Sequence, residues 1–342
     1  MPKLGLAALF MGLSLALGLV AWQGFGDVAK ALNQAGFQLL WLGPAFALPL
    51  LLSAFAWAAI FPPGTRPALS RLVLASWIAV SINWLLPVAQ IGGEIAKAAW
   101  LARRAAPAAT MVAATVVDKV LQTAGQALVA LIGVGLALAL AGASDLVPFA
   151  LVFALLMLGL LIGFVYAQRH GLLQRLAGAA ERAFLKRALS RNNGLRHPGR
   201  SDAAAGGLAG RIAGHTADVG AAVTRICADP LPMAVYLALR LASRLVMAGE
   251  VWLVLMFLGH PVTVLEALMI ECLAQTVRSA AFALPGAYGV QEGGFILLGA
   301  LVGVPADLAL TASLAKRLRE LLVGLPGLAF YQLSEGRLRA PA

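Results

Sequence analysis

Charged residues are scarce in this chain. Only 12% of its 342 residues are Asp, Glu, Lys or Arg, whereas 61% are hydrophobic. A soluble domain carries roughly 25% charged residues. Long, mainly apolar stretches such as residues 108–140 are long enough to cross a hydrocarbon core of about 30 Å. With a mean hydropathy of +0.87, the composition predicts an integral membrane protein.

Cysteine and histidine are also few, with two Cys and four His. Cys227 borders a basic segment and Cys272 lies in an apolar run, so no disulfide framework is indicated. The histidines lack metal-ligand spacing. There is no Walker loop, no dinucleotide-binding glycine pattern and no Ser-His-Asp order. We therefore expect no metal, no cofactor and no enzymatic activity.

Acidic residues are outnumbered by basic ones, which gives a net charge of +11. In a membrane protein, basic loops and anionic lipid headgroups explain such an excess better than nucleic acid does. The excess is largest in residues 168–229, which hold ten Lys or Arg against four acids. Positive charge favours the cytoplasmic side, so this segment is predicted to be a basic cytoplasmic loop. Within it, residues 172–189 form a basic amphipathic pattern suited to an anionic leaflet.

The chain is predicted to be one all-α polytopic membrane domain, residues 1–342, with about seven or eight transmembrane helices. Predicted spans cover residues 5–22, 39–61, 108–140, 146–167, 231–258 and 307–333. Basic residues flanking the spans, including Arg337 and Arg339, place the C-terminus in the cytoplasm. The remaining apolar segments, 70–102 and 264–304, are interrupted.

Each interrupted segment is predicted to be a broken helical hairpin, re-entrant or fully spanning. The breaks are Pro87, Gly92 and Gly93 in the first, and Pro285 and Gly286 in the second. Backbone freed at such breaks has no partner in lipid, so it must be buried in protein or line a wet cavity.

The two hairpins share a residue pattern without a gap. After each break proline come a glutamate at seven residues, a proline at twenty and a charged residue at thirty-one. These residues are Pro87, Glu94, Pro107 and Asp118 in one half, and Pro285, Glu292, Pro305 and Lys316 in the other. This indicates an internal repeat with cores 70–140 and 264–333. Counting span directions gives the repeats opposite orientation, which is typical of transporters with a midplane site.

Ionisable residues inside predicted spans cost roughly 2.5–3.5 kcal/mol each and are candidate functional groups. The candidate substrate-binding or translocation residues are Glu94, Lys97, Asp118, Gln122, Arg240, Arg244, Glu271, Arg278, Glu292, Lys316, Arg317 and Glu320. Alternatively, these groups pair with one another and only hold the helices together. Because arginine grips phosphate and carboxylate in two places, an anionic headgroup is the expected cargo. The carboxylates could carry protons or release the cargo.

The residues around the breaks resemble the lysylphosphatidylglycerol synthase transmembrane-region family, also called flippase-like domain proteins. The resemblance rests on Asn83–Pro87 with Gly92–Glu94, Val117–Lys119, Leu284–Ala287 and Gln291–Gly294. Within the family, the chain is most similar to the branch associated with hopanoid biosynthesis. The resemblance implies a lipid-handling protein of the bacterial inner membrane, without the lysyl-transfer domain of the fused synthases.

We therefore expect translocation or trafficking of a hopanoid or related amphiphilic lipid. Hopanoids, anionic phospholipids and proteins of lipid biosynthesis are the expected partners, and the oligomeric state is left open. Two alternatives remain: a membrane-embedded transferase acting on lipid headgroups, and a non-catalytic scaffold of a biosynthetic complex. A transferase would need a soluble donor, and a scaffold would tolerate changes in the cavity but not deletion of the basic loop.

Overall fold

The protein is described here from a computed structural model. It describes residues 36–86, 91–104, 107–142, 218–281, 287 and 289–339, with isolated positions between 148 and 166. All regular secondary-structure elements in these ranges are helices, and none of the ranges contains a strand. In chain order they are η1 (Gly36–Trp41), α3 (Leu42–Ala45), α4 (Ala47–Ala59), α5 (Leu69–Leu85), α6 (Gly92–Ala102), α7 (Ala108–Ala141), α11 (Pro230–Phe257), α12 (Val264–Ala280), α13 (Val290–Ala300) and α14 (Ala306–Arg339).

Three stretches of the described chain are long and apolar enough to cross a membrane: Gly36–Ala59, Ala108–Leu140 and Pro230–Phe257. α5 is a shorter apolar helix of 17 residues. α14 is 34 residues long, but it carries several charged residues in its middle. The prediction of an all-α membrane protein is confirmed.

The helix bounds differ from the predicted ones mainly in the second half of the chain. α13 begins at Val290 rather than at residue 293, because Gly289 takes a φ of 78° and Glu292 caps the new N-terminus. α12 ends at Ala280 instead of residue 284, and α14 continues past residue 333 to Arg339. The predicted span 5–22, most of 146–167, the segment 172–189 and the breaks Pro87, Pro285 and Gly286 lie outside the described residues.

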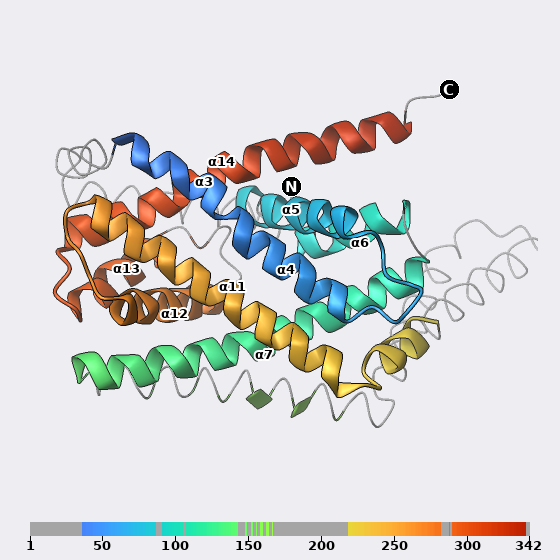
Figure 1. Cartoon of the computed structure of the whole chain (residues 1–342), viewed down its shortest axis with the longest axis horizontal. Coiled ribbons are helices and arrows are strands. Elements are labelled where there is room, and N and C mark those ends of the chain that lie inside the picture. Colours follow the sequence, from blue (N-terminus) through green and yellow to red (C-terminus); the bar gives the residue numbers. More distant parts are fainter. Residues whose placement is uncertain are drawn as a thin grey trace, which may run out of the picture.

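The long helices α7 and α14 lie along opposite edges of the molecule and run in opposite directions (Figure 1). Between them α4 and α11 cross in front, also antiparallel, and pack on each other. The hairpin α5–α6 packs beside α14 and α7, and the hairpin α12–α13 packs beside α7 and α14. The outer ends of the two hairpins point toward opposite ends of the molecule (Figure 1).

Several helices have matching bounds when the two halves of the chain are aligned so that Pro107 falls on Pro305. In this alignment of the halves, α6 and α13 begin and end at equivalent positions, as do α7 and α14. α4 and α11 end at Ala59 and Phe257, which are also equivalent in the same alignment. The coincidence therefore involves three helices of each half.

Two apolar cores stabilise the bundle, one toward each end of the long helices. One core contains Trp57, Leu72 and Tyr236, and the other contains Val134, Val251 and Ile270. Along α7 the first core reaches Leu121 and the second begins at Val134; along α11 they reach Tyr236 and Val251. Most buried polar side chains of the described helices lie in a polar layer where the two cores approach each other, with Asp118 beside Val117 of the first core and Glu271 beside Ile270 of the second.

Candidate functional site

A cavity of about 180 Å³ lies in this polar layer, between the two halves of the chain. Residues from α4, α5, α6, α7, α11, α12 and α14 line it. Its charged or amide-bearing lining residues are Asn83, Glu94, Lys97, Asp118, Lys119, Gln122, Arg240, Arg244, Gln275, Arg278 and Arg319. Most of the predicted residues of the first half therefore share one cavity with Arg240, Arg244 and Arg278.

On one side of the cavity, Lys97 is the centre of a buried ion-pair network. Its ammonium group donates a hydrogen bond to Asp118 of α7 and lies 2.5 Å from Glu94 Oε2. Asp118 also accepts hydrogen bonds from the Tyr236 hydroxyl and from Gln122 Nε2, the latter at 3.2 Å. Because loss of Lys97 would leave two buried carboxylates without their shared ion-pair partner, this network stabilises the packing of α6 against α7.

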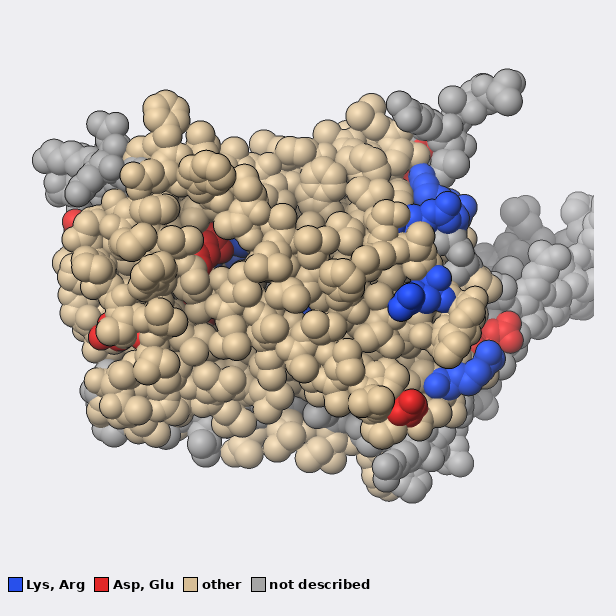
Figure 2. Space-filling view, in the orientation of Figure 1, with Lys and Arg blue, Asp and Glu red and all other residues tan. Residues whose placement is uncertain are grey.

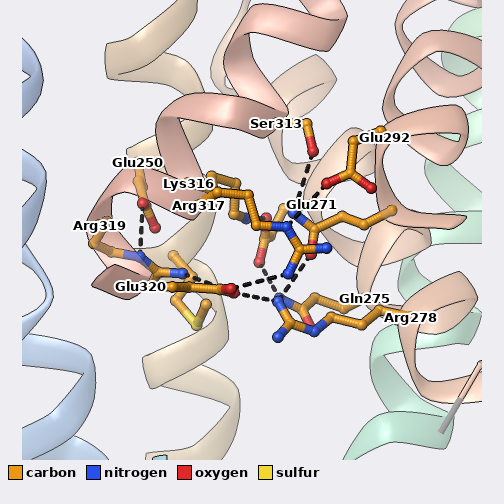
Figure 3. A network of polar contacts seen from close by, with 12 residues as sticks. Glu250, Glu271, Gln275, Arg278, Glu292, Ser313, Lys316, Arg317, Arg319 and Glu320 are labelled. Carbon is orange, nitrogen blue, oxygen red and sulfur yellow. Dashed lines mark hydrogen bonds and ion pairs between the residues drawn. The ribbon is translucent and has the colours of Figure 1, made fainter. Parts of the chain in front are cut away.

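On the other side lies a larger network that joins α11, α12, α13 and α14 (Figure 3). Lys316 donates to Glu271, which also accepts from Gln275 Nε2 at 2.9 Å. Glu320 accepts from Arg278 Nη1 at 2.5 Å and from Arg317 Nη1 at 3.0 Å. The paired charged residues of the second half thus fit the alternative interpretation, in which they hold the helices together.

Glu292 has a mainly structural position in this network. Its carboxylate accepts the backbone N–H of Gly289 at 2.6 Å, which caps the first turn of α13. The other oxygen accepts from Arg317 Nε at 2.9 Å. Glu271, Glu292, Lys316, Arg317 and Glu320 lie behind the cavity wall rather than on it. Among the predicted site residues, these five support the wall instead of facing the cavity.

Two arginines of the cavity, Arg240 and Arg244, form no ion pair within 4 Å with an acid of the described residues, although Asp118 and Glu94 act on Arg240 from a longer distance. Arg240 lies over the Tyr236 ring, 5.8 Å from its centroid. Arg244 Nη1 donates to the sulfur of Met247, at 3.7 Å. Both are on α11, one turn apart, and both line the cavity.

The described polar layer carries an excess of positive charge. It contains eight basic side chains, Lys97, Lys119, Arg240, Arg244, Arg278, Lys316, Arg317 and Arg319. It contains six acidic ones, Glu94, Asp118, Glu250, Glu271, Glu292 and Glu320. This excess of two positive charges suits an anionic ligand.

The selection of site residues from the sequence missed an aromatic wall and one ion pair. Trp57 lies 4.3 Å below the Lys97 ammonium, and Phe46 and Trp84 both stack on the Arg319 guanidinium. Arg319 Nε is 3.2 Å from Glu250 Oε1. Buried Trp and Phe read as ordinary core residues in a sequence, so no signal distinguished them. Glu250 was visible as an acid within a span.

The described residues contain no group of three or more His, Cys, Asp or Glu side chains placed to hold a metal ion. Arginines dominate the cavity instead.

Comparison with known protein families identifies the family of this chain. The model of the lysylphosphatidylglycerol synthase transmembrane region matches residues 9–327. The chain belongs to this family. Membership agrees with the apolar helices and associates the protein with membrane lipids. No curated protein and no solved structure matches the chain. For this lysylphosphatidylglycerol synthase transmembrane-region protein, the site must therefore be interpreted from its own residues.

Proposed function

We propose that this protein moves an amphiphilic lipid with an anionic headgroup across the bacterial inner membrane, without acting as an enzyme. The observation that carries the proposal is the pair Arg240 and Arg244, which line the cavity without an ion pair to an acid within 4 Å among the described residues. Arginine forks bind phosphate oxygens in two places, and their attraction is strong in a layer shielded from water.

The size of the cavity supports a headgroup rather than a whole lipid. About 180 Å³ is less than the roughly 300–1,000 Å³ of sites that enclose a drug-sized ligand. A glycerophosphate-sized group would fill it, and the apolar tail would remain outside. A protein that moves a lipid across a bilayer must shield the polar headgroup while the apolar tail stays in hydrocarbon, and this arrangement would do so.

An inverted repeat is part of the proposal. The matching helix bounds in the alignment of Pro107 with Pro305 and the opposite directions of α7 and α14 (Figure 1) support it. In transporters built from inverted repeats, the site lies at the midplane between interrupted helices. The cavity lies beside the N-terminus of α6, and the network of Glu292 lies at the N-terminus of α13.

The proposed orientation places the C-terminus in the cytoplasm. Figure 2 shows that Lys and Arg atoms of the visible face gather at the end of the molecule where α4 ends and α11 begins. Arg103 and Arg104, at the end of α6, bind Glu335 near the end of α14 at 2.7 and 3.2 Å. These ends therefore share one side, which the excess of basic residues in cytoplasmic loops makes the inner one.

The sequence resemblance to the hopanoid-associated branch also makes hopanoids a proposed cargo. The arginine pair favours an acidic headgroup over a neutral one. The two cargoes are separated by measuring the membrane distribution of hopanoids in a deletion strain. Hopanoids made in normal amount but retained in the inner membrane would favour hopanoid export.

The direct test uses proteoliposomes that contain a trace of phosphatidylglycerol labelled on its acyl chain. A membrane-impermeant quencher added outside reports how fast the inner-leaflet label moves outward. We expect Arg244→Gln to slow the movement at least tenfold. Arg225→Gln removes the same charge from an exposed position and should leave the rate unchanged. Equal rates for wild type and Arg244→Gln would refute the proposal.

A further inference from the structure

We infer that the lipid tail travels in an apolar groove between α3–α4 and α5–α14, and that Phe46 separates this groove from the headgroup cavity. The inference rests on the proposed function and adds the path of the hydrocarbon chain. It is carried by two hollows that share a wall.

The groove has a volume of about 480 Å³ and is lined by Leu40, Pro44, Ala47, Trp77 and Leu322 among others. Its lining is apolar apart from the Trp77 indole N–H, which donates to the Val323 carbonyl at 2.9 Å. Its surroundings are apolar and exposed, with Trp41 at 71% and Leu48 at 51% exposure. In a membrane protein such a face contacts hydrocarbon, which makes a lipid chain the natural occupant.

Phe46 and Leu50 line both the groove and the polar cavity. Phe46 is almost fully buried between them. Its ring lies 4.6 Å from the Arg319 guanidinium and meets the Trp84 ring edge-on at 4.9 Å. A lipid with its headgroup at Arg244 and its tail in the groove must pass this aromatic wall.

The backbone at Phe46 is suited to movement. α3 ends at Ala45 and α4 begins at Ala47, so Phe46 lies at the junction of two helices. Pro44 and Pro49 lack N–H groups, which removes helical hydrogen bonds to the carbonyls of residues 40 and 45. Proline positions are where helices bend. A small bend here would move the Phe46 ring and open the cavity sideways toward lipid.

Gly43 provides a reversible test. A Cβ built on Gly43 would lie 3.9 Å from the Leu322 Cβ across the groove. This is within the roughly 3.5–4.5 Å that a disulfide requires. Gly43→Cys with Leu322→Cys, in a background with Cys227→Ser and Cys272→Ser, should form a disulfide that fixes α3 to α14.

We expect the oxidised protein to move labelled phosphatidylglycerol at least tenfold more slowly, with full recovery after reduction. The two single-cysteine variants should be insensitive to the oxidant. Gly43→Phe, which fills the groove, should be slow as well, whereas Gly43→Ala should match wild type. Binding of glycerol 1-phosphate to the detergent-solubilised protein should survive in all of these variants and be lost in Arg244→Gln.

The outcomes separate the two proposals. If the disulfide forms and transport is unchanged while Arg244→Gln is slow, the lateral path is wrong and the headgroup site stands. If Arg244→Gln is as fast as wild type, the proposed function itself fails. Loss of glycerol 1-phosphate binding in the oxidised protein would also overturn the inference, because the groove would then be part of the headgroup site.

Discussion

Asp118 and Lys316 are matched when Pro107 is aligned with Pro305, carry opposite charges and are each paired with a residue of a neighbouring helix. Asp118 on α7 binds Lys97 of α6, and Lys316 on α14 binds Glu271 of α12. The same alignment places Lys97 on Phe295, whose ring centroid lies 5.4 Å from the Lys316 ammonium. Equivalent positions therefore carry different chemistry, and the cavity faces mainly the first network.

Breaking the first network should destabilise the protein strongly. Lys97→Met leaves the carboxylates of Glu94 and Asp118 buried without their cation. Loss of one partner of a buried ion pair costs about 3–5 kcal/mol. We expect a lower unfolding midpoint in detergent, measured by thermal or denaturant unfolding. The double variant Lys97→Met/Asp118→Asn should lose less stability than the sum of the losses in the two single variants. If the two losses are additive, the two side chains are not directly coupled.

Glu94 and Glu292 should respond differently to neutralisation. Glu94 lines the cavity, and Lys97 keeps Asp118 as its partner when Glu94 is neutralised, so Glu94→Gln should slow lipid movement and lower the unfolding midpoint only slightly. Glu292 caps α13 and binds Arg317, so Glu292→Gln should lower stability by roughly 1–3 kcal/mol. Transport rate and unfolding midpoint measured on the same preparations test this. Identical behaviour of the two variants would refute the division between cavity and support residues.

Gly93 should tolerate no side chain. A Cβ there would lie 2.2 Å from the Ala79 carbonyl oxygen, which belongs to the backbone of α5. Gly93→Ala should therefore separate α5 and α6 and destabilise the protein by about 1–3 kcal/mol or more. Gly293→Ala is the matched control in α13, because a Cβ there meets nothing within 4 Å. Equal stability of the two variants would contradict the close packing of the first hairpin.

The proposed orientation can be tested by labelling single cysteines from one side. Arg66 and Pro261 are exposed loop residues next to α5 and α12, the first arms of the two hairpins. In a background with Cys227→Ser and Cys272→Ser, Arg66→Cys should react with an impermeant reagent only after the inner membrane is opened. Pro261→Cys should react in intact spheroplasts. Labelling of both from the same side would exclude inverted hairpins.

Much of the fold could be predicted because each membrane-spanning helix corresponds to a long apolar stretch of the sequence. The apolar runs 108–140 and 231–258 became α7 and α11 within one residue at each end. Positions of a membrane helix that face lipid and positions that face the protein interior are both mainly apolar. The length and apolarity of a stretch are therefore enough to identify a membrane span. The predicted bounds of the two half-helices, 90–102 and 293–304, did not match in the alignment of Pro107 with Pro305, whereas α6 and α13 of the structure do.

The sequence by itself also determined which residues are expensive in a membrane, since any charge within an apolar run is conspicuous. It could not determine their partners. Only the tertiary structure brings Lys97 to Asp118 and places Glu271 and Glu320 behind the wall. It also leaves Arg240 and Arg244 on the cavity wall with no ion pair to an acid within 4 Å among the described residues. The reason is physical: pairing depends on the angle and height at which distant helices cross, and side-chain packing of the whole bundle sets both.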